Sequence, residues 1–320
     1  MRQQGQHTPQ TGTVRDYLQL LFAVLVWGSA YVVVRSAGQE MEPAALAFCR
    51  VAASVLFFLP FMLKARVPLR EVWAAKWYLL LMGLTGVAIF IFVMSFGLCH
   101  STATNGSLIN ATNPIVMVFL AALLLKTKVK KSDILPLVLA VAGAVILLLA
   151  KSQGNGLVFS IGDLAFVVNV FVWALFSILL VPFDNRLPGV VWGFWINLIG
   201  LVLLLPVVLW EGYDFTAMSG SSWLKVIYAG IFCGGIGTVF WGNGVSRLGV
   251  TMAALFNNLN PLFAVVLAVL VLGESLNGWQ ILGGVLILLA VGGRSVWEYR
   301  RSKRQNEQKR EVISSEYRNG

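Results

Sequence analysis

Long apolar stretches, separated by short polar ones, run along the whole chain. A transmembrane helix needs about 20 mostly apolar residues, and ten stretches reach or approach that length. They span residues 17–36, 43–63, 75–97, 104–125, 133–150, 161–181, 190–210, 223–245, 251–272 and 279–297. These stretches are apolar all round, whereas the strands of a membrane barrel alternate between apolar and polar positions. The pattern therefore predicts an all-α polytopic membrane protein with ten transmembrane helices.

The composition agrees with a membrane environment. Of the 320 residues, 58% are hydrophobic and 12% are charged, against roughly 45–50% and about 25% in soluble domains. So few charges cannot cover a water-soluble surface, which excludes a soluble enzyme and a secreted disulfide scaffold. The cysteines (Cys49, Cys99 and Cys233) lie in apolar stretches without metal-ligand spacing. We therefore expect no metal and no cofactor.

The basic residues are distributed unevenly between the loops. Lys and Arg accumulate in the cytoplasmic segments of membrane proteins. If the N-terminus is cytoplasmic, 20 of the 24 basic residues lie in inside segments, and the outside segments hold only Arg35, Lys151 and Lys225. Both termini are thus predicted to be cytoplasmic. The net charge of +10 lies in loops and in the C-terminal tail, so we expect the lipid bilayer as a partner and no nucleic acid.

The chain contains an internal duplication at an offset of 147 residues. The offset places Asn113-Pro114 on Asn260-Pro261, Asn110 on Asn257, Gly83 on Gly230 and Asp16 on Asp163, and Trp27 meets Trp173 after a slip of one residue. We therefore predict a tail at 1–15, a five-helix repeat at 16–150, a second repeat at 161–297 and a basic tail at 298–320. An odd number of spans per repeat forces the second copy to insert upside down. Inverted repeats are the architecture of many secondary transporters.

These residues resemble those of a known family. The resemblance rests on Trp27-Gly28-Ser29, Arg50 and Asn113-Pro114 in the first copy, and on Trp173, Asn260-Pro261 and Leu-Gly-Glu-Ser at 272–275 in the second. The chain resembles the EamA-type transporters of the drug/metabolite transporter superfamily over nearly its whole length outside the tails. The resemblance implies export or exchange of a small metabolite, such as an amino acid, across a bacterial or archaeal cytoplasmic membrane. The first copy departs from the pattern, because Lys126-Thr127 stands where the second has Gly273-Glu274.

Polar residues in the fourth and ninth spans are candidates for substrate binding. Ser107, Asn110 and Pro114 share one helix face, because they recur at three- and four-residue steps. In the ninth span Asn257 and Pro261 repeat this spacing. A proline breaks the backbone hydrogen bond to the carbonyl four residues before it, so each repeat offers an amide beside a loosened carbonyl. Asn113 and Asn260 belong to the same helix breaks. The alternative is that the asparagines link neighbouring helices as polar glue.

Aromatic and basic residues within the spans are further candidates. Trp27, Tyr31, Trp173 and Trp241 would form flat cavity walls, or would pack against lipid. Arg50 is a basic residue well within a span, where a charge is costly and faces protein or water. It would attract an anionic substrate group, or would hold the fold by bonding carbonyls. The orientation of other polar residues cannot be assigned from the pattern; these are Asn169, Ser177, Asn197, Thr238 and Asn243.

The distribution of acidic residues and histidines limits the chemistry. The histidines, His7 and His100, lie in a tail and at a loop, which leaves no basis for a catalytic triad. The central portions of the spans hold no Asp, Glu or His, so we expect a facilitator or an exchanger rather than a proton-driven pump. The function predicted is a monomeric secondary transporter for a small metabolite. The alternatives are a lipid-linked sugar flippase and a scaffold or sensor that does not transport.

Overall fold

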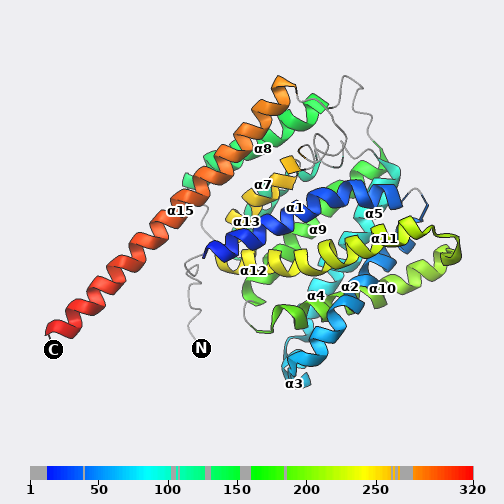
Figure 1. The fold of residues 1–320 in the computed structure, drawn as a ribbon, viewed down its shortest axis with the longest axis horizontal. Coiled ribbons are helices and arrows are strands. Elements are labelled where there is room, and N and C mark those ends of the chain that lie inside the picture. The colour runs from blue at the N-terminus through cyan, green and yellow to red at the C-terminus, as the bar shows by residue number, and fades with distance from the viewer. Residues whose placement is uncertain are drawn as a thin grey trace.

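The computed structural model describes residues 13–38, 40–101, 106, 109–126, 131–151, 160–183, 186–260, 262–263, 266 and 277–319. This part of the chain is helical and contains no strand (Figure 1). The first half of the chain supplies α1 (Val14–Ala37), α2 (Pro43–Ala65), α3 (Leu69–Ala74), α4 (Lys76–Gly83), η1 (Leu84–Ile89), α5 (Phe90–His100), α7 (Asn113–Leu124) and α8 (Lys131–Lys151). The second half supplies α9 (Ile161–Phe183), α10 (Gly189–Glu211), η2 (Phe215–Ala217), α11 (Gly220–Tyr228), η3 (Ala229–Gly237), α12 (Thr238–Leu248), α13 (Val250–Asn257) and α15 (Gly278–Asn319).

Several of these helices have the length and composition of membrane spans. Within the described ranges, five helical runs are long and apolar enough to cross a bilayer: Pro43–Ala65, Lys76–His100, Ile161–Phe183, Gly189–Glu211 and Gly220–Leu248. About half of each run is buried, which leaves the other half to face lipid. Helices α1, α8 and α15 have 24, 21 and 42 residues. The predicted fourth and ninth spans include residues outside the described ranges. The all-α fold predicted from hydropathy is confirmed.

The third helix of each repeat contains a π-helical segment at an equivalent place. In the first repeat α4, η1 and α5 are continuous, and in the second α11, η3 and α12 are continuous. Shifting η1 by 147 residues places it at 231–236, inside η3. A π-helical turn holds an extra residue in the helix and occurs often at functional sites. The duplication therefore extends to local backbone geometry.

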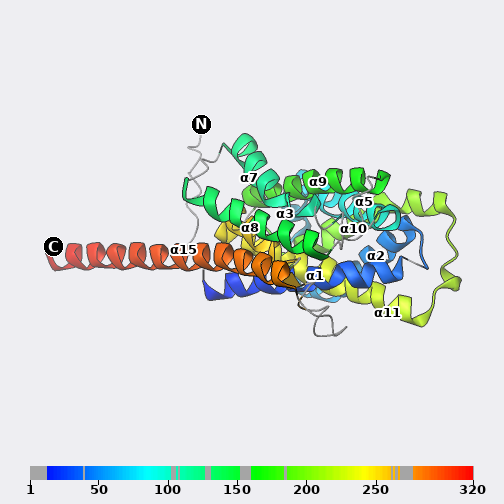
Figure 2. The same ribbon diagram turned by 90° about the horizontal axis from the view of Figure 1, so that it is seen from above.

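Equivalent helices of the two repeats pack against each other. α2 lies against α10, α7 against α13, and α8 against α15; α8 and α15 run side by side in both views (Figures 1 and 2). α1 packs along α11, η3 and α12, and its counterpart α9 packs along α4, η1 and α5. Exchanging the repeats turns each of these contacts into itself or into another of the set, so the bundle has approximate two-fold symmetry.

A pair of glycines shows this symmetry at atomic scale. A Cβ atom added to Gly244 in α12 would lie 2.2 Å from the side chain of Leu20 in α1. A Cβ atom added to Gly97 in α5 would lie 3.0 Å from the ring of Phe166 in α9. The two glycines are 147 residues apart and their two partners 146. The first helix of each repeat therefore approaches the third helix of the other repeat at a glycine.

The two repeats run in opposite directions through the bundle. One buried apolar cluster joins Val34 and Ala37, near the end of α1, to Phe166, near the start of α9. α1 therefore ends where α9 begins. The inverted arrangement expected from five spans per repeat follows from this contact.

The two ends of the bundle differ in charge. The loops where α1 ends and α2 begins, and those between α10 and α11, hold Glu40, Glu42, Glu211 and Asp214; we call this the acidic end. The opposite end, where α1 begins and α2 and α12 end, holds Arg15, Lys64, Arg66, Arg70, Lys76 and Arg247; we call it the basic end.

The C-terminal segment continues the last helix. Residues 298–320 were predicted as a basic tail, and α15 extends from its apolar part through that tail to Asn319 without a break. Figure 1 shows it projecting beyond the other helices. The segment 294–319 contains no Gly or Pro and is rich in Arg, Lys, Glu and Gln, which are strong helix formers. A helix that is already nucleated within the bundle can extend through such a sequence.

Candidate functional site: a cavity between the repeats

A cavity lies between the two repeats. Its volume is about 90 Å³, counted as the space open to the centres of water molecules, whereas a single water requires roughly 10–15 Å³ on that measure. The walls come from α1, α2, η1, α5, α7, α9, α10, η3, α12 and α13 and from the turns beside α7 and α13. The cavity can therefore hold several waters or a small solute.

The lining of the cavity follows the duplication. Sixteen of the twenty lining residues form eight pairs separated by 147 residues, or by 146 for the tryptophans. The pairs are Trp27 with Trp173, Arg50 with Asn197, Gly86 with Cys233, Val87 with Gly234, Ile91 with Thr238, Asn110 with Asn257, Ala111 with Asn258, and Asn113 with Asn260. The other four are Ala30, Phe90, Met94 and Asn169. Each repeat thus contributes an equivalent wall.

The helix that carries the paired asparagines is interrupted beside the cavity in both repeats. α13 ends at Asn257 and residue 258 forms a turn, while in the first repeat residues 111–112 form a turn before α7 begins at Asn113. Pro114 lies in the first turn of α7, where its missing N–H removes no helical hydrogen bond. The interruption turns consecutive polar side chains toward one space. Ser107 and Pro261, which belong to the same predicted motif, lie outside the described residues.

Several amide side chains line the cavity. The side-chain nitrogens of Asn169, Asn197 and Asn260 donate to the Phe90 carbonyl, the Gly193 carbonyl and the Asn257 Oδ1 at 2.8, 2.8 and 2.9 Å. Buried amide atoms without a hydrogen-bond partner among the described residues are the Oδ1 atoms of Asn113, Asn197 and Asn260 and both amide atoms of Asn258. Because buried polar groups are almost always paired, these atoms are suited to bind water or a solute.

Three tryptophans form one aromatic cluster beside the cavity. The ring centroids of Trp27, Trp173 and Trp241 lie 5.0 to 5.5 Å apart. Trp27 Nε1 donates to the Cys233 carbonyl at 3.0 Å, and Trp241 Nε1 donates to Ser177 Oγ at 3.1 Å. Trp27 and Trp173 line the cavity. Trp241 was expected to line it too, but it is fully buried behind the other two rings.

Arg50 brings a positive charge to the cavity wall. Its side chain is 5% exposed, and Nε and Nη1 have no hydrogen-bond partner in the described part of the chain. Helix α2 is held close to η3 here, because Ser54 Oγ, which lies 3.1 Å from the Arg50 carbonyl of its own helix, donates to the Gly230 carbonyl of η3 at 2.7 Å. Arg50 lies seven residues into α2, roughly 10 Å from the acidic end at 1.5 Å per residue.

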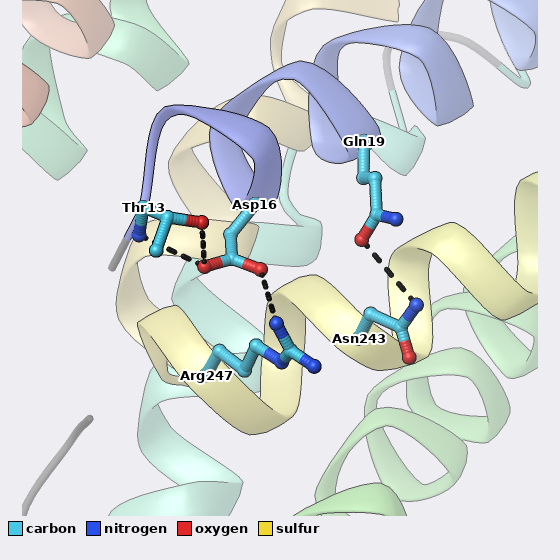
Figure 3. Close-up of polar contacts among 5 residues, drawn as sticks. All are labelled: Thr13, Asp16, Gln19, Asn243 and Arg247. Carbon is cyan, nitrogen blue, oxygen red and sulfur yellow. Dashed lines mark hydrogen bonds and ion pairs between the residues drawn. The ribbon is translucent and has the colours of Figure 1, made fainter. Parts of the chain in front are cut away.

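Polar contacts join α1 to α12 at the basic end of the bundle (Figure 3). Arg247 Nη1 lies 3.0 Å from Asp16 Oδ1, and Asn243 Nδ2 donates to Gln19 Oε1 at 3.3 Å. The Asp16 carboxylate also caps α1, since the Thr13 N–H and hydroxyl donate to its Oδ2 at 2.9 and 2.7 Å. We call these residues the α1–α12 contact. Nearby, Arg294 of α15 forms a buried ion pair of 2.7 Å with Asp133 of α8.

An equivalent contact lies at the acidic end, between α5 and α9. Asp163, the counterpart of Asp16, accepts hydrogen bonds from the Ser160 N–H at 2.7 Å and from the Ser101 hydroxyl at the end of α5. The counterpart of Arg247 is His100, next to Ser101. The α5–α9 contact thus mirrors the α1–α12 contact, with a hydroxyl in place of the guanidinium.

Two glutamates at the acidic end form hydrogen bonds with segments that are distant in the sequence. Glu211 Oε1 and Oε2 accept from the N–H groups of Ala44 and Ala45 at 3.0 and 3.1 Å, at the start of α2. The Ser222 hydroxyl donates to Glu40 Oε2 at 2.8 Å. This bond, followed by one from Ser219, lowers the pKa of the Glu40 carboxyl from its ordinary 4.5.

The structure brings most of the predicted site residues together. Seven of them line the cavity: Trp27, Arg50, Asn110, Asn113, Trp173, Asn257 and Asn260. Tyr31 lies in α1, but its side chain is outside the described part. The role of the seven lining residues in substrate binding stays a prediction. Sequence reasoning did not select Asn258 as a ligand, because on an unbroken helix it would point about 100° away from Asn257. It left Asn169 and Asn197 unoriented, although Asn197 stands at the 147-residue offset from Arg50.

A helical bundle built from two inverted repeats, with a polar cavity between them and equivalent polar contacts at its two ends, is the architecture of an integral membrane transporter rather than an enzyme. Comparison with protein families identifies the family: the model of the EamA-like transporter family matches residues 15–149 and again residues 160–293. The chain therefore belongs to the EamA-like transporter family. The two matches coincide with the two repeats.

Relatives share about a quarter of their residues with the chain. The "Uncharacterized transporter YetK" of Bacillus subtilis is 25% identical, covering 87% of this chain and 84% of its own. The "Probable amino-acid metabolite efflux pump" of Salmonella typhimurium is 27% identical over 86% and 92%. The "Probable terminal-alkyne amino-acid exporter" of Streptantibioticus cattleyicolor is 26% identical over 85% and 90%. A solved crystal structure shares the fold, with a TM-score of 0.73 at 20% identity over 90% of this chain and 99% of its own.

Proposed function

We propose that the protein is a secondary transporter that moves a small metabolite, an amino acid or a related compound, out of the cell by alternating access. The observation that carries this proposal is the pseudo-symmetric lining, in which sixteen of twenty residues form matched pairs from inverted repeats. Two inverted halves can exchange conformations, and each exchange opens a central site to the opposite side. The printed names of the Salmonella and Streptantibioticus relatives support amino-acid-like substrates and export.

The two end contacts act as the gates of this cycle. Separation of α1 from α12 at Asp16 and Arg247 opens the cavity at the basic end. Separation of α5 from α9 at Ser101 and Asp163 opens it at the acidic end. The basic end faces the cytoplasm, together with both termini, because Lys and Arg accumulate on that side. The transporter works as a monomer in the cytoplasmic membrane and has no nucleic-acid partner.

Transport takes place without obligatory proton coupling. Proton relays in membranes use Asp, Glu or His, and none of these is among the twenty lining residues that the structure describes. Counterflow of a labelled metabolite in proteoliposomes should therefore continue when a protonophore collapses the pH gradient. A collapse of counterflow under these conditions, with unlabelled substrate still present in excess, would exclude this mode of transport.

The decisive experiment removes the amides of the cavity one repeat at a time. Purified protein in liposomes is screened by counterflow with a panel of labelled metabolites, and Asn110→Ala and Asn257→Ala are then measured with the best substrate. Each change should weaken transport about fivefold, since one hydrogen bond contributes about 1 kcal/mol. Asn277→Ala, an exposed amide at the start of α15, is the control. Unchanged transport in both cavity variants would refute the site.

A flippase for lipid-linked sugars is supported less well. Its substrate carries a phosphate or diphosphate group, which proteins bind with several basic residues. Among the described lining residues Arg50 is the single cation. A small metabolite with one acidic group matches that charge.

A further inference from the structure

The cavity is symmetric in position but not in charge. Arg50 on α2 and Asn197 on α10 stand at the same place in the two repeats, and both line the cavity. They are 5% and 1% exposed, and α2 packs along α10. The substitution of a cation by a neutral amide at an otherwise matched position gives the cavity two chemically different sides.

Within the part of the chain that the structure describes, the Arg50 guanidinium forms no hydrogen bond or ion pair that stabilises the fold. Nε and Nη1 are buried and donate to nothing within the described ranges, and Arg50 forms no ion pair there. The hydrogen bond that holds α2 to η3 at this level comes from Ser54, whose hydroxyl donates to the Gly230 carbonyl. A buried unpaired charge is strongly unfavourable, so an anionic group that enters the cavity would stabilise the guanidinium.

Other residues of the cavity wall offer acceptors. The nitrogen of Asn197 is engaged with the Gly193 carbonyl at 2.8 Å, so its Oδ1, which has no partner in this part of the structure, is the atom left for a ligand. The Oδ1 atoms of Asn113 and Asn260 are in the same state. Amide oxygens accept hydrogen bonds from ammonium and hydroxyl groups.

We propose that Arg50 is the carboxylate-binding subsite of the cavity and that the amide oxygens of Asn197, Asn113 and Asn260 take a donor group on the same molecule. The proposal rests on the transport function above and narrows its substrate class to small carboxylates that carry an amino or hydroxyl group. A guanidinium presents parallel N–H groups that match the two oxygens of a carboxylate. Trp27 and Trp173 supply a flat apolar wall for the rest of the substrate.

The same arrangement rejects organic cations. An amine without a carboxylate leaves Arg50 unpaired and brings a second positive charge into a site of low dielectric, where like charges repel strongly. No carboxylate among the described lining residues is present to offset that charge. The protein therefore discriminates between an amino acid and the amine formed from it by decarboxylation.

The first experiment measures binding by the purified full-length protein in detergent, through the rise in its melting temperature. The twenty amino acids are screened, and each one that binds is compared with its deaminated acid and its decarboxylated amine; for leucine these are 4-methylpentanoate and 3-methylbutylamine. The amino acid should bind most tightly, the acid more weakly, and the amine at least tenfold more weakly than the amino acid. Equal binding of amine and amino acid, or no binding by any amino acid or by the corresponding hydroxy acids, would overturn the proposal.

Variants of Arg50 separate a binding role from a structural one. Arg50→Gln should weaken binding of the amino acid at least tenfold. Arg50→Lys should restore part of the affinity, because lysine returns the positive charge without the parallel N–H groups of the guanidinium. Without ligand, Arg50→Gln should melt no lower than the native protein, since it removes an unpaired buried charge. Arg70→Gln, an exposed arginine on α3, is the matched control. Loss of stability in Arg50→Gln with unchanged ligand binding would show that Arg50 has a structural role and would refute the proposal.

A transport measurement distinguishes failure of this proposal from failure of the transport function. One outcome is that counterflow of a neutral solute such as a nucleobase proceeds equally well in the native protein and in Arg50→Gln, with no competition from any carboxylate. That result would support the transport function and refute the carboxylate subsite. If carboxylates compete in the native protein but not in Arg50→Gln, the subsite is established.

Discussion

Replacing Arg247 with glutamine removes the ion pair that joins α12 to α1 at the basic end. The Asp16 side chain is 2% exposed but that of Arg247 is 43% exposed, so solvent screens the pair and its contribution is about 1 kcal/mol rather than that of a buried pair. A loss of that size shifts an equilibrium about fivefold. Arg247→Gln should therefore populate the state open at the basic end about five times more.

The assay uses a cysteine that already lines the cavity. With Cys49 and Cys99 changed to serine, Cys233 is the remaining thiol, and it is 3% exposed in the closed cavity. Its labelling by a membrane-impermeant maleimide should be about fivefold faster in Arg247→Gln when the reagent reaches the basic end, in inverted vesicles. Labelling from the acidic end, in intact cells, should not accelerate.

Asp16→Asn supplies the partner variant for a double-mutant cycle. If the ion pair is the gate, the double variant should label no faster than the single ones, since both changes remove one interaction. Arg70→Gln serves as the control for loss of a basic residue at the same end. A change of less than twofold in Arg247→Gln, or an equal acceleration from both ends, would refute the assignment of this contact as a gate.

Three further predictions concern stability. Arg294→Met leaves the buried carboxylate of Asp133 unpaired and should destabilise the protein by about 3–5 kcal/mol in a melting experiment, whereas the double change Arg294→Met and Asp133→Leu should recover most of the loss; no recovery would mean that the pair is not what matters. Gly230→Ala places a Cβ atom 2.4 Å from a backbone carbonyl of α2 and should cost about 1–3 kcal/mol, while Gly292→Ala, with nothing within 4 Å, should be neutral; equal melting temperatures of the two would contradict this. Because its pKa is lowered in the folded protein, Glu40 stabilises the acidic end fully above pH 4.5 and loses that effect as the pH falls through the lowered pKa; Glu40→Gln should abolish this part of the decline in melting temperature, and an unaltered pH profile would exclude it.

The sequence predicted the fold because the signals that determine it are repeated many times. Hydropathy located the spans, and matched Asn-Pro pairs such as those at 113 and 260 revealed the duplication. The same offset relates Arg50 to Asn197, but the duplication is recognised from identical residues, and these two differ in type. The structure reveals this pair because it places both residues in the cavity wall.

Helix rotation is the main quantity that the sequence did not supply. Trp241 lies in a span like Trp27 and Trp173, yet its ring packs behind theirs and its N–H bonds Ser177. The orientation of a helix within a bundle depends on packing against all its neighbours, and a single apolar sequence carries little of that information. Asn258 reaches the cavity only because the helix is interrupted there.

The continuous α15 helix has a mechanical consequence. At 1.5 Å per residue its 42 residues measure about 63 Å, roughly twice the thickness of the hydrocarbon core. A rod of this kind holds its tip at a set height above the lipid, where a flexible coil of the same residues would sweep through a hemisphere. A fluorophore attached near Asn319 should accordingly report a single, narrow distance from the bilayer surface.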